Sequence, residues 1–533
     1  MASSTTSFAQ CWDRQARERG ERVALSDRRR SLSWREAADL SRRLARGLLA
    51  RAEPGAVVAC WLPNWVELYL LRIACERAGL IWLPIAASLR EWELQNILER
   101  ARPAVLIVPE WFRDRDCAAD ASSVLAKLSS PPPQLVISGG PRPAGGISLD
   151  ELVQRGSGPL APGLPERPAD DALVILPTSG GTGLPKFAEF RISAWFRRAQ
   201  AQAELLELRA EDVVLALSQG IGPSIIPLFA APLVGAAACL VDESDPGIVF
   251  EELARVRPTI VCGVPPQITA LLDHPDWSSA GVDRVRLWYT TGMAFPPGAA
   301  ARLEGSTRGM VLSGYGAMDF GGWAVPSPGD PPNVRFHTVG HARGGTELRL
   351  MDDAGREVSA GEVGEIWGRG PSCASGYFRD EVATREAWTS DGWFRTGDLG
   401  RFDAAGNLAI VGRKRDIIRR GGKTIQPGEI EALLSTHPQI YKAAVVGFPD
   451  PALGERTCVF VVPKRGEIIT LGDVTGYLRH RRIASFKLPE RLELVDDLPV
   501  RGDKIDRAAL RKMIEERVLG AAAARARADA KSP

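Results

Sequence analysis

The chain has 533 residues, of which 45% are apolar and 25% are charged, and its formal net charge is +2 at pH 7. These values are ordinary for a soluble globular protein, so they exclude a wholly disordered chain and a coiled coil. The near-neutral charge also provides no bulk attraction for nucleic acid or an acidic membrane. At about 150 residues per domain, the length predicts more than one domain.

The N-terminal stretch and the cysteines indicate a cytoplasmic protein without a disulfide or zinc framework. No apolar run reaches the ~18 residues of a membrane-spanning helix, and the start of the chain has no apolar signal core. The eight cysteines lie far apart and form no CxxC pair, so we expect buried free thiols. An Asp–His–Ser relay is compatible with the five histidines, but no GxSxG elbow accompanies it.

Helical and strand patterns alternate in the first part of the chain. Ser33 and Glu36 have the spacing of a capping box, and apolar residues follow at helical intervals. Further elements are predicted as strands at 56–62, 81–85, 104–108 and 134–138 and as a helix at 65–78. This alternation is typical of a largely parallel sheet covered by helices, so the predicted fold class is α/β. The segment 129–169 is rich in Pro and Gly and is predicted as surface loop.

The most informative stretch runs from Leu173 to Lys186. An apolar strand pattern leads into six small residues, which are Thr178, Ser179, Gly180, Gly181, Thr182 and Gly183. Glycines let backbone N–H groups converge on a polyanion, hydroxyls add donors and the lysine adds a positive charge. The stretch predicts a phosphate-binding loop, although it is not a GxxxxGK[ST] loop. A flexible Gly/Ser turn with an incidental lysine is the alternative.

The texture of the sequence changes after Gly344. Short strands are predicted at 347–350, 364–367 and 408–411, which indicates a β-rich module. Earlier in the chain, a strand is also predicted at 213–217, before a Gly-rich segment. Beyond the charged stretch GRKRD at 412–416, a fresh α/β pattern runs to about residue 520.

Several further motifs follow the phosphate loop in one order. They are Gly314–Tyr315–Gly316–Ala317–Met318–Asp319, Gly364–Gly370 with Gly376–Tyr377, Asp391–Leu399, Gly412–Asp416, Gly421–Glu431 and Val500–Arg507. Together with the loop, they resemble the signature motifs of the adenylate-forming superfamily, which includes acyl- and aryl-CoA synthetases, peptide-synthetase adenylation domains and firefly luciferase. The resemblance covers nearly the whole chain, and the C-terminal half most resembles acyl-CoA synthetases.

The resemblance implies a large N-terminal domain of α/β-layered subdomains plus a small β-rich subdomain, and a small mobile α/β C-terminal domain. The expected divisions are an ATP- and acid-binding domain at 1–412, a hinge at 413–416, a catalytic domain at 417–520 and a disordered tail at 521–533. Rotation at the hinge residue Arg415 would move Lys504 away and bring the Gly421–Gly422 loop toward the thiol channel.

The superfamily reaction has two halves. A carboxylate attacks the α-phosphate of Mg·ATP to give an acyl-adenylate and pyrophosphate, and a thiol then displaces AMP. Because the first half joins two anions, it needs positive charge and oriented donors more than a base.

The resemblance assigns roles residue by residue. The implied catalytic residues are Lys504, Lys186 and Asp319, and Mg²⁺ is assigned to Asp319 and Thr182. Tyr315 would stack on adenine, and Asp398 would accept hydrogen bonds from the ribose hydroxyls. The full nucleotide-binding set is expected to be Thr178, Ser179, Gly180, Gly181, Thr182, Gly183, Gly314, Tyr315, Gly316, Ala317, Met318, Asp398 and Arg413.

Some positions depart from the superfamily pattern. Gly181 replaces the second threonine of the loop, and Met318 replaces the threonine of the YGxTE motif. The acidic residue there is Asp319, one methylene shorter than glutamate. Asp503 stands where a glycine usually precedes Lys504 and puts a negative charge beside it. Asp319 and Asp503 therefore raise the alternative of a non-catalytic nucleotide-binding relative.

The segment after the strand at 213–217 is expected to set the acid specificity. The predicted pocket residues are Gly220, Ile221, Gly222, Ile225, Phe229, Gly292 and Met293. This segment lacks the Asn of hydroxybenzoate activators and the Asp of amino-acid activators. It therefore predicts a roomy apolar pocket without a fixed charge, suited to a bulky or long hydrophobic acid. A simple helix-entry turn is the alternative role of the glycines.

The expected activity is ATP-dependent activation of a hydrophobic carboxylic acid, followed by thioester formation with CoA. The expected cofactors are ATP, Mg²⁺ and CoA or a phosphopantetheine thiol. A stand-alone adenylase of a natural-product pathway, which hands its acyl-AMP to a carrier protein or a separate ligase, is the alternative. The expected partners are a small-molecule acid and CoA or a carrier protein, without nucleic acid or membrane insertion, and with a homodimer as one option.

Overall fold

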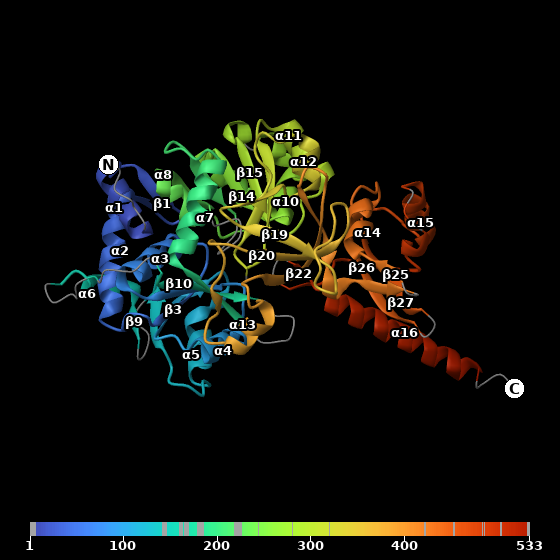
Figure 1. The fold of residues 1–533 in the computed structure, drawn as a ribbon. Coiled ribbons are helices and arrows are strands. Elements are labelled where there is room, and N and C mark those ends of the chain that lie inside the picture. Colours follow the sequence, from blue (N-terminus) through green and yellow to red (C-terminus); the bar gives the residue numbers. More distant parts are fainter. Residues whose placement is uncertain are drawn as a thin grey trace. The chain divides into compact units, whose positions relative to one another are not determined.

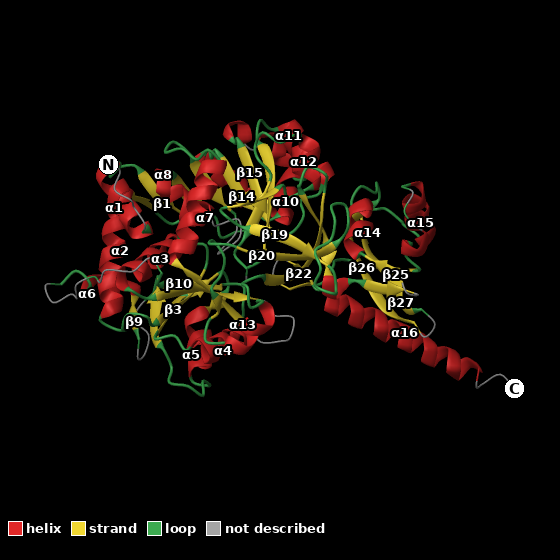
Figure 2. Ribbon diagram, in the orientation of Figure 1, coloured by secondary structure: helices red, strands yellow, loops and turns green. Residues whose placement is uncertain are grey.

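The computed structural model describes residues 7–140, 146–158, 164, 170–178, 186–217, 226–243, 245–279, 281–318, 320–420, 423–450, 453–481, 483, 485–501 and 504–529. The chain forms two compact units. The first contains Met1–Leu348 and Gly368–Arg395, and the second contains Arg349–Trp367 and Thr396–Pro533. Helices and strands alternate in both, which confirms the predicted α/β fold class (Figure 1, Figure 2).

The larger sheet of the first unit carries the predicted nucleotide motif at one strand end. In the described residues its order is β18 (His341–Arg343), β17 (Trp323–Val325), β16 (Met310–Gly316), β15 (Leu287–Thr291), β14 (Ile260–Gly263), β12 (Val213–Ala216), β13 (Ala237–Leu240), β1 (Val23–Ser26) and β2 (Ser31–Ser33). The strands from β16 to β1 pair in parallel, so their carboxyl ends meet at one edge.

A second sheet of the same unit carries the predicted phosphate loop. Its described strands run in the order β21 (Gly376–Tyr377), β11 (Lys186–Arg191), β10 (Ala172–Thr178), β4 (Ile81–Ala86), β3 (Val57–Leu62), β5 (Val105–Pro109), β8 (Gln134–Ser138) and β9 (Ile147–Ser148). Strand β3 is buried along its whole length, as its continuous apolar sequence predicts for a central parallel strand.

Helices cover these sheets. The described helices of the first unit are α1 (Phe8–Glu18), α2 (Trp34–Leu49), α3 (Val66–Ala78), α4 (Glu91–Ala101), α5 (Cys117–Leu125), α6 (Leu149–Arg155), α7 (Ile192–Leu205), α8 (Ala231–Val234), α9 (Pro246–Val256), α10 (Pro265–Leu272), α11 (Pro297–Ser306), α12 (Pro332–His337) and α13 (Glu381–Ala387). The capping box predicted at Ser33 and Glu36 is present at the start of α2.

The main hydrophobic core joins both sheets of the first unit through the helices between them. It contains side chains of β3 and β4, of β12 and β15, and of α1, α2, α3 and α7. All eight cysteines are free thiols, and all are buried except the partly exposed Cys373, as predicted. No helix of the described chain is both long and apolar enough to cross a membrane.

The second unit contains most of a four-stranded sheet and the C-terminal α/β module. The four strands are β19 (Glu347–Met351), β20 (Gly364–Arg369), β22 (Phe394–Phe402) and β23 (Leu408–Arg413). The module contains β24 (Ile418–Arg420), β25 (Lys423–Ile425), α14 (Pro427–Leu434), β26 (Ile440–Asp450), β27 (Gly454–Pro463), α15 (Leu471–His480), β28 (Arg491–Leu494), β29 (Val500–Arg501), β30 (Lys504–Ile505) and α16 (Arg507–Asp529).

Two sequence predictions differ from this architecture. Helix α6 and strand β9 occur within 129–169, which was predicted as surface loop, because Ser148 caps α6 by accepting a hydrogen bond from the Glu151 amide. Helix α16 continues to Asp529, where a disordered tail was predicted from 521. Alanine and arginine are strong helix formers, so this Ala- and Arg-rich stretch continues the helix.

The units also divide elsewhere than at the predicted hinge. The second unit begins its last segment at Thr396, so β23 and the hinge residue Arg415 lie within it. Rotation about Arg415, which lies in a short 3₁₀ helix at Lys414–Asp416, stays a prediction.

A buried ion pair ties α3 to the start of the chain. Arg72 Nη1 lies 2.7 Å from Glu76 Oε2, and both side chains are almost fully buried. The other carboxylate oxygen, Oε1, accepts hydrogen bonds from the Ser7 hydroxyl and the Ala9 amide. Burial alone would raise the pKa of Glu76, but the Arg72 charge and these hydrogen bonds lower it below its ordinary value.

We expect the substitution Glu76→Gln to lower the free energy of unfolding by about 3–5 kcal/mol, because it leaves the Arg72 charge buried without its partner. The wild-type stabilisation is present above the ordinary pKa of 4.5 and is lost as the pH falls through the lower folded value. Denaturant unfolding at several pH values measures both effects. Glu18→Gln, on the exposed face of α1, is the control and should change stability little. Equal stability of Glu76→Gln and wild type at neutral pH would contradict this role.

Candidate functional site

The predicted phosphate loop connects two paired strands. Thr178 ends β10, Lys186 begins β11, and the two residues lie opposite each other in the antiparallel register. The loop residues Ser179, Gly180, Gly181, Thr182 and Gly183 lie outside the described residues. The strands thus fix the two ends of the loop, as a strand–loop arrangement for a polyanion requires.

Both residues at the ends of this loop have unused polar capacity. The Thr178 hydroxyl is buried and has no hydrogen-bond partner among the described residues. Lys186 Nζ lies 5.0 Å from the ring centroid of Tyr377 on the neighbouring strand β21, and no described carboxylate pairs with it. An anion at this place would supply the missing acceptors, so the residues present fit a phosphate group.

The predicted adenine motif lies at the carboxyl edge of the larger sheet. Tyr315 and Gly316 end β16, and Gly314 pairs in parallel with Thr291 at the end of β15. A Cβ on Gly314 would lie 3.0 Å from the Tyr289 hydroxyl, and one on Gly316 would lie 3.1 Å from the Gly322 carbonyl. The glycines therefore permit close packing at the edge where open α/β sheets bind ligands.

A pocket opens beside this motif in the first unit. Its lining residues are Leu176, Phe190, Trp195, Arg198, Tyr289, Thr291, Tyr315, Gly316, Ala317, Met318, Gly321 and Trp323. Four of the predicted nucleotide residues at the end of β16 and in the following turn therefore share one cavity with four aromatic rings of other elements. The cavity wall also contains the guanidinium of Arg198. None of the predicted acid-pocket residues that the structure describes lines this cavity, so the prediction of an acid pocket without a fixed charge stays a prediction.

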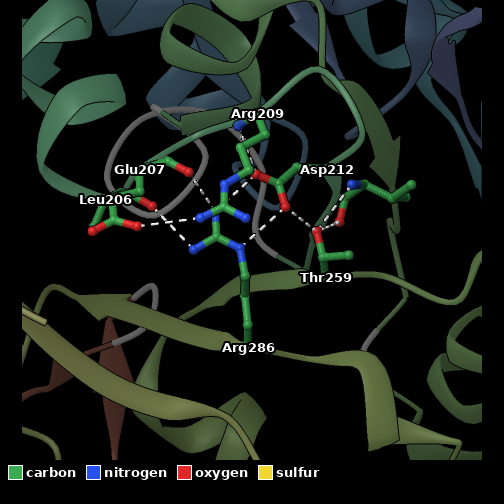
Figure 3. A network of polar contacts seen from close by, with 7 residues as sticks. Leu206, Glu207, Arg209, Asp212, Thr259 and Arg286 are labelled. Carbon is green, nitrogen blue, oxygen red and sulfur yellow. Dashed lines mark hydrogen bonds and ion pairs between the residues drawn. The ribbon is translucent and has the colours of Figure 1, made fainter.

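A polar network holds α7 against β15 (Figure 3). Arg286, which precedes β15, donates to the carbonyls of Leu206 and Glu207 at the end of α7 over 3.1 and 3.0 Å. Its Nη2 also lies 2.7 Å from Asp212 Oδ2, and Asp212 Oδ1 accepts a 2.6 Å hydrogen bond from Thr259. Burial would raise the pKa of Asp212, but these hydrogen bonds hold it below its ordinary value. The network fixes the helix that carries Arg198 to the strand that carries Tyr289.

The predicted ribose residue lies in the second unit. Asp398 on β22 is 7% exposed, and its Oδ1 lies 3.0 Å from Arg413 Nε on the paired strand β23. The Asp398 amide donates to the Thr396 hydroxyl, which itself donates to the Ile366 carbonyl. Arg413 and Asp398, which the sequence placed in one nucleotide site, are therefore in direct contact.

A second carboxylate supports this turn and was not predicted. Glu365 accepts a hydrogen bond from the Gly397 amide over 3.2 Å and pairs with Lys414 Nζ at 3.0 Å. Gly397 has a φ of +69°, which a glycine adopts without strain. The hydrogen bonds that Lys414 donates to the carboxylates of Asp353 and, to a smaller extent, Glu365 raise the pKa of Lys414. The motif containing Glu365 was recognised in the sequence, but only the fold shows that it braces the RTGD turn.

The predicted catalytic lysine lies on a short hairpin of the second unit. Lys504 is exposed, begins β30 and pairs with Arg501 of β29. The Asp506 amide closes this hairpin onto the Pro499 carbonyl over 2.8 Å. Arg507 Nη2 then lies 2.5 Å from Glu431 Oε2, and Glu431 Oε1 accepts a 2.7 Å hydrogen bond from the Val445 amide. The ion pair joins the start of α16 to α14 and so fixes the base of the lysine hairpin.

Some of the other predicted pocket residues lie within the described part of the chain, and the rest lie outside it. Gly292 and Met293 follow β15 directly, with Met293 37% exposed. Phe229 is buried, and its ring centroid lies 4.3 Å from that of Trp195, so it supports a pocket wall from behind. The residues Gly220, Ile221, Gly222 and Ile225 of this pocket, Gly421 and Gly422 of the thiol loop, and Asp319 and Asp503 lie outside the described residues.

The described residues contain no group of three or more His, Cys, Asp or Glu side chains that could hold a metal ion. The predicted Mg²⁺ residues Asp319 and Thr182 lie outside them, so this assignment stays a prediction. The Thr178 hydroxyl and Lys186 suit the phosphate groups to which such an ion would bind.

Comparison with curated proteins gives relatives of two kinds. The medium-chain fatty-acid–CoA ligase of Escherichia coli (strain K12) is 31% identical over 96% of this chain and 91% of its own length. The indoleacetate–CoA ligase of Aromatoleum aromaticum is 32% identical over 95% of this chain and 98% of its own. The 2,3-dihydroxybenzoate-AMP ligase of Bacillus subtilis (strain 168) is 29% identical over 94% of this chain and 92% of its own.

Comparisons with solved structures and with family models indicate the same kind of enzyme as these relatives. The ATP-bound MatB structure from Rhodopseudomonas palustris has a TM-score of 0.83 and 26% identity, over 95% of this chain and 98% of the other. The anthranilate CoA ligase AuaEII, in complex with anthranoyl-AMP, has a TM-score of 0.86 at 24% identity, over 96% and 98%, and supports the fold. The AMP-binding enzyme model matches residues 12–378, and the AMP-binding enzyme C-terminal domain model matches residues 429–502. The chain therefore belongs to the AMP-binding enzyme family, whose adenylate-forming members its motifs resemble.

Proposed function

We propose that the protein activates a hydrophobic carboxylic acid with ATP to form an acyl-adenylate, and then transfers the acyl group to the thiol of CoA. The observation that carries this proposal is the pair of unused polar groups at the ends of the phosphate loop, Thr178 and Lys186. The match to the AMP-binding enzyme family supports a phosphate of ATP as the ligand of these two groups. Relatives named as fatty-acid and aryl-acid CoA ligases support both the acid and the thiol.

Each of the candidate site residues would have a separate role in the first half-reaction. Lys186 and the loop would hold the β- and γ-phosphates, and the glycines around Tyr315 would let adenine approach the edge of the sheet. Asp398, held by Arg413 and the RTGD turn, would accept hydrogen bonds from the ribose. Lys504 would place a positive charge between the carboxylate and the α-phosphate, where two anions must approach. Bound Mg²⁺ would neutralise phosphate charge.

The acceptor thiol distinguishes two versions of this function. Some relatives are named as CoA ligases and others as AMP ligases of aryl acids, among them a salicyl-AMP ligase of Mycobacterium tuberculosis that is 32% identical over 86% of this chain. CoA is the proposed acceptor, with a carrier protein or a partner ligase as the second candidate. The Gly421–Gly422 loop and rotation at Arg415 belong to either version.

Acid-dependent release of pyrophosphate from ATP, measured over a library of carboxylic acids, tests the first half. Repeating the assay with CoA and detecting acyl-CoA by mass spectrometry tests the second. Acyl-CoA formation by the purified enzyme supports CoA as the acceptor. Pyrophosphate release with retained acyl-AMP and no acyl-CoA favours a carrier protein. Nucleotide binding without turnover of any acid would instead indicate a non-catalytic relative.

We expect Lys504→Ala to slow acyl-adenylate formation by about 10²–10⁴-fold, the effect of losing one charge directed at the transition state. Thioester formation from a supplied acyl-adenylate should change little, because the proposed rotation moves Lys504 away from that step. Single-turnover assays measure the two halves separately. Lys512→Ala, on the exposed face of α16, is the matched control. A similar loss in both halves would argue against rotation.

We expect Asp398→Asn to raise the KM for ATP by roughly 10–100-fold, since hydrogen bonds to a charged group contribute about 1.5–3 kcal/mol each. Both half-reactions should slow, because the ribose stays bound throughout. Arg401→Gln, an exposed change on the same strand, is the control. Unchanged KM and kcat in Asp398→Asn would remove Asp398 from the nucleotide site.

A further inference from the structure

Arg198 lies on α7 and presents its guanidinium to the pocket beside the adenine motif. Its hydrogen bond among the described residues goes to the Gly321 carbonyl, and its Nε is buried without a partner. No described carboxylate lies within ion-pair distance of it. Burial lowers the pKa of Arg198 to about 10, so the group is still charged at neutral pH.

Three buried arginines of the first unit, by contrast, each have a carboxylate partner. Arg72 pairs with Glu76, Arg77 with Asp13 at 2.5 Å, and Arg335 with Glu304. Taking a charge out of water costs several kcal/mol unless a partner compensates for it. Among the described residues, Arg198 lacks the carboxylate partner that these three arginines have.

Aromatic rings fix the guanidinium of Arg198 in place. Its Cζ lies 5.5 Å from the Trp195 ring centroid and 6.0 Å from that of Trp323, within the range of cation–π attraction. This attraction offsets part of the cost of burial. It does not satisfy the N–H groups, which require an acceptor oxygen near the plane of the guanidinium.

Two further polar groups lie on the same side of α7. Tyr289 on β15 lines the pocket with Arg198, and burial raises the pKa of its phenol to about 12, so the hydroxyl keeps its proton. Gln202, one turn after Arg198, is fully buried, and neither of its amide atoms makes a hydrogen bond of normal geometry in the described structure. The amide nevertheless lies close enough to Tyr289 to lower the pKa of the phenol.

The free space beside these groups is small. The described walls enclose a cavity of about 50 Å³, which is sufficient for a group of a few heavy atoms. Phe190, Trp195 and Trp323 make the surrounding walls aromatic. The site thus combines apolar walls with donors that converge at one place, the arrangement of a pocket that reads one polar group on an otherwise apolar ligand.

We propose that Arg198 and Tyr289 bind a second acceptor oxygen of the substrate, distinct from its reacting carboxylate. The substrate class is then a hydrophobic acid that carries a hydroxyl, carbonyl or second carboxylate group. This inference rests on the proposed acid activation and narrows it. It adds a charged group to a substrate site that the sequence predicted, from other residues, to have no fixed charge.

The test uses matched acids that differ in one oxygen function. One series is octanoate, ω-hydroxyoctanoate and octanedioate, and the other is phenylpropanoate with its para-hydroxy and para-carboxy derivatives. In at least one series, wild-type kcat/KM for pyrophosphate release should be about tenfold or more higher for an oxygenated acid than for the plain one. The preferred member distinguishes a neutral acceptor from a second carboxylate. Preference for the plain acid in both series would overturn the proposal.

Arg198→Met should abolish this preference, because it should slow the oxygenated acid far more than the plain one. Arg197→Met makes the same change at an exposed neighbour on α7 and should keep the wild-type preference. If Arg198→Met slows plain and oxygenated acids equally, Arg198 has a structural role or binds the reacting carboxylate, and the proposal is wrong. Should Arg198→Met fail to fold in thermal melting, Arg198→Lys and Tyr289→Phe decide by the same comparison.

A binding measurement separates this proposal from the proposed function. If wild type releases no pyrophosphate with any acid, acid activation fails, and the acid-induced rise in melting temperature becomes the readout. A larger rise with oxygenated acids than with plain ones, lost in Arg198→Met, would still support the recognition site. Equal shifts for both kinds of acid would reject it.

Discussion

The free-energy cost of burying a charge explains the main ion pairs in the first unit of this protein. Arg72, Arg77 and Arg335 each meet a carboxylate, and the Arg286–Asp212 pair is completed by Thr259 and two carbonyl groups. Lys186 and Arg198, which face the predicted phosphate loop and the pocket, differ from these arginines because no described carboxylate neutralises either. A protein that joins two anions needs cations whose charge is not already satisfied by its own residues.

The same constraint explains why the ion-pair network near α7 matters for function. A guanidinium or phenol recognises a ligand well only if its position is fixed before binding, since otherwise the ligand must also order it. Arg286 joins the end of α7 to the start of β15 through three acceptors. Arg198 and Tyr289 lie further along these two elements, so a network without ligand contacts positions the residues that face the pocket.

The sequence predicted the fold well because its signals were local. The apolar run of β3, the capping box of α2 and the strand before the phosphate loop each depend on neighbouring residues, and all three are present. The prediction was wrong where composition replaced pattern: the Pro- and Gly-rich segment at 129–169 contains α6, and the C-terminal tail is helical to Asp529. In the first segment a capping serine, and in the second the high helix propensity of alanine, outweighed the overall amino-acid composition.

Site residues were predictable only where a contiguous motif contained them. Asp398 and Arg413 belong to motifs recognised separately, and their ion pair appears once β22 and β23 pair. The bracing contacts of Glu365 and Glu431 join residues more than thirty positions apart, so no spacing rule in the sequence could indicate them.

Arg198 is the clearest example of a candidate site residue that only the folded structure reveals. In the sequence it is one arginine of an ordinary amphipathic helix, next to the exposed Arg197 and without any motif. Only the packing of α7 on β15 distinguishes the two, because it turns one guanidinium toward Trp195, Trp323 and Tyr289 and leaves the other in solvent. The proposed recognition site for a second substrate oxygen therefore depends on a helix outside the segment at 218–229 that the resemblance indicates. Since a buried donor left without an acceptor costs about 1–3 kcal/mol, such a residue can exclude plain acids as strongly as it favours oxygenated ones.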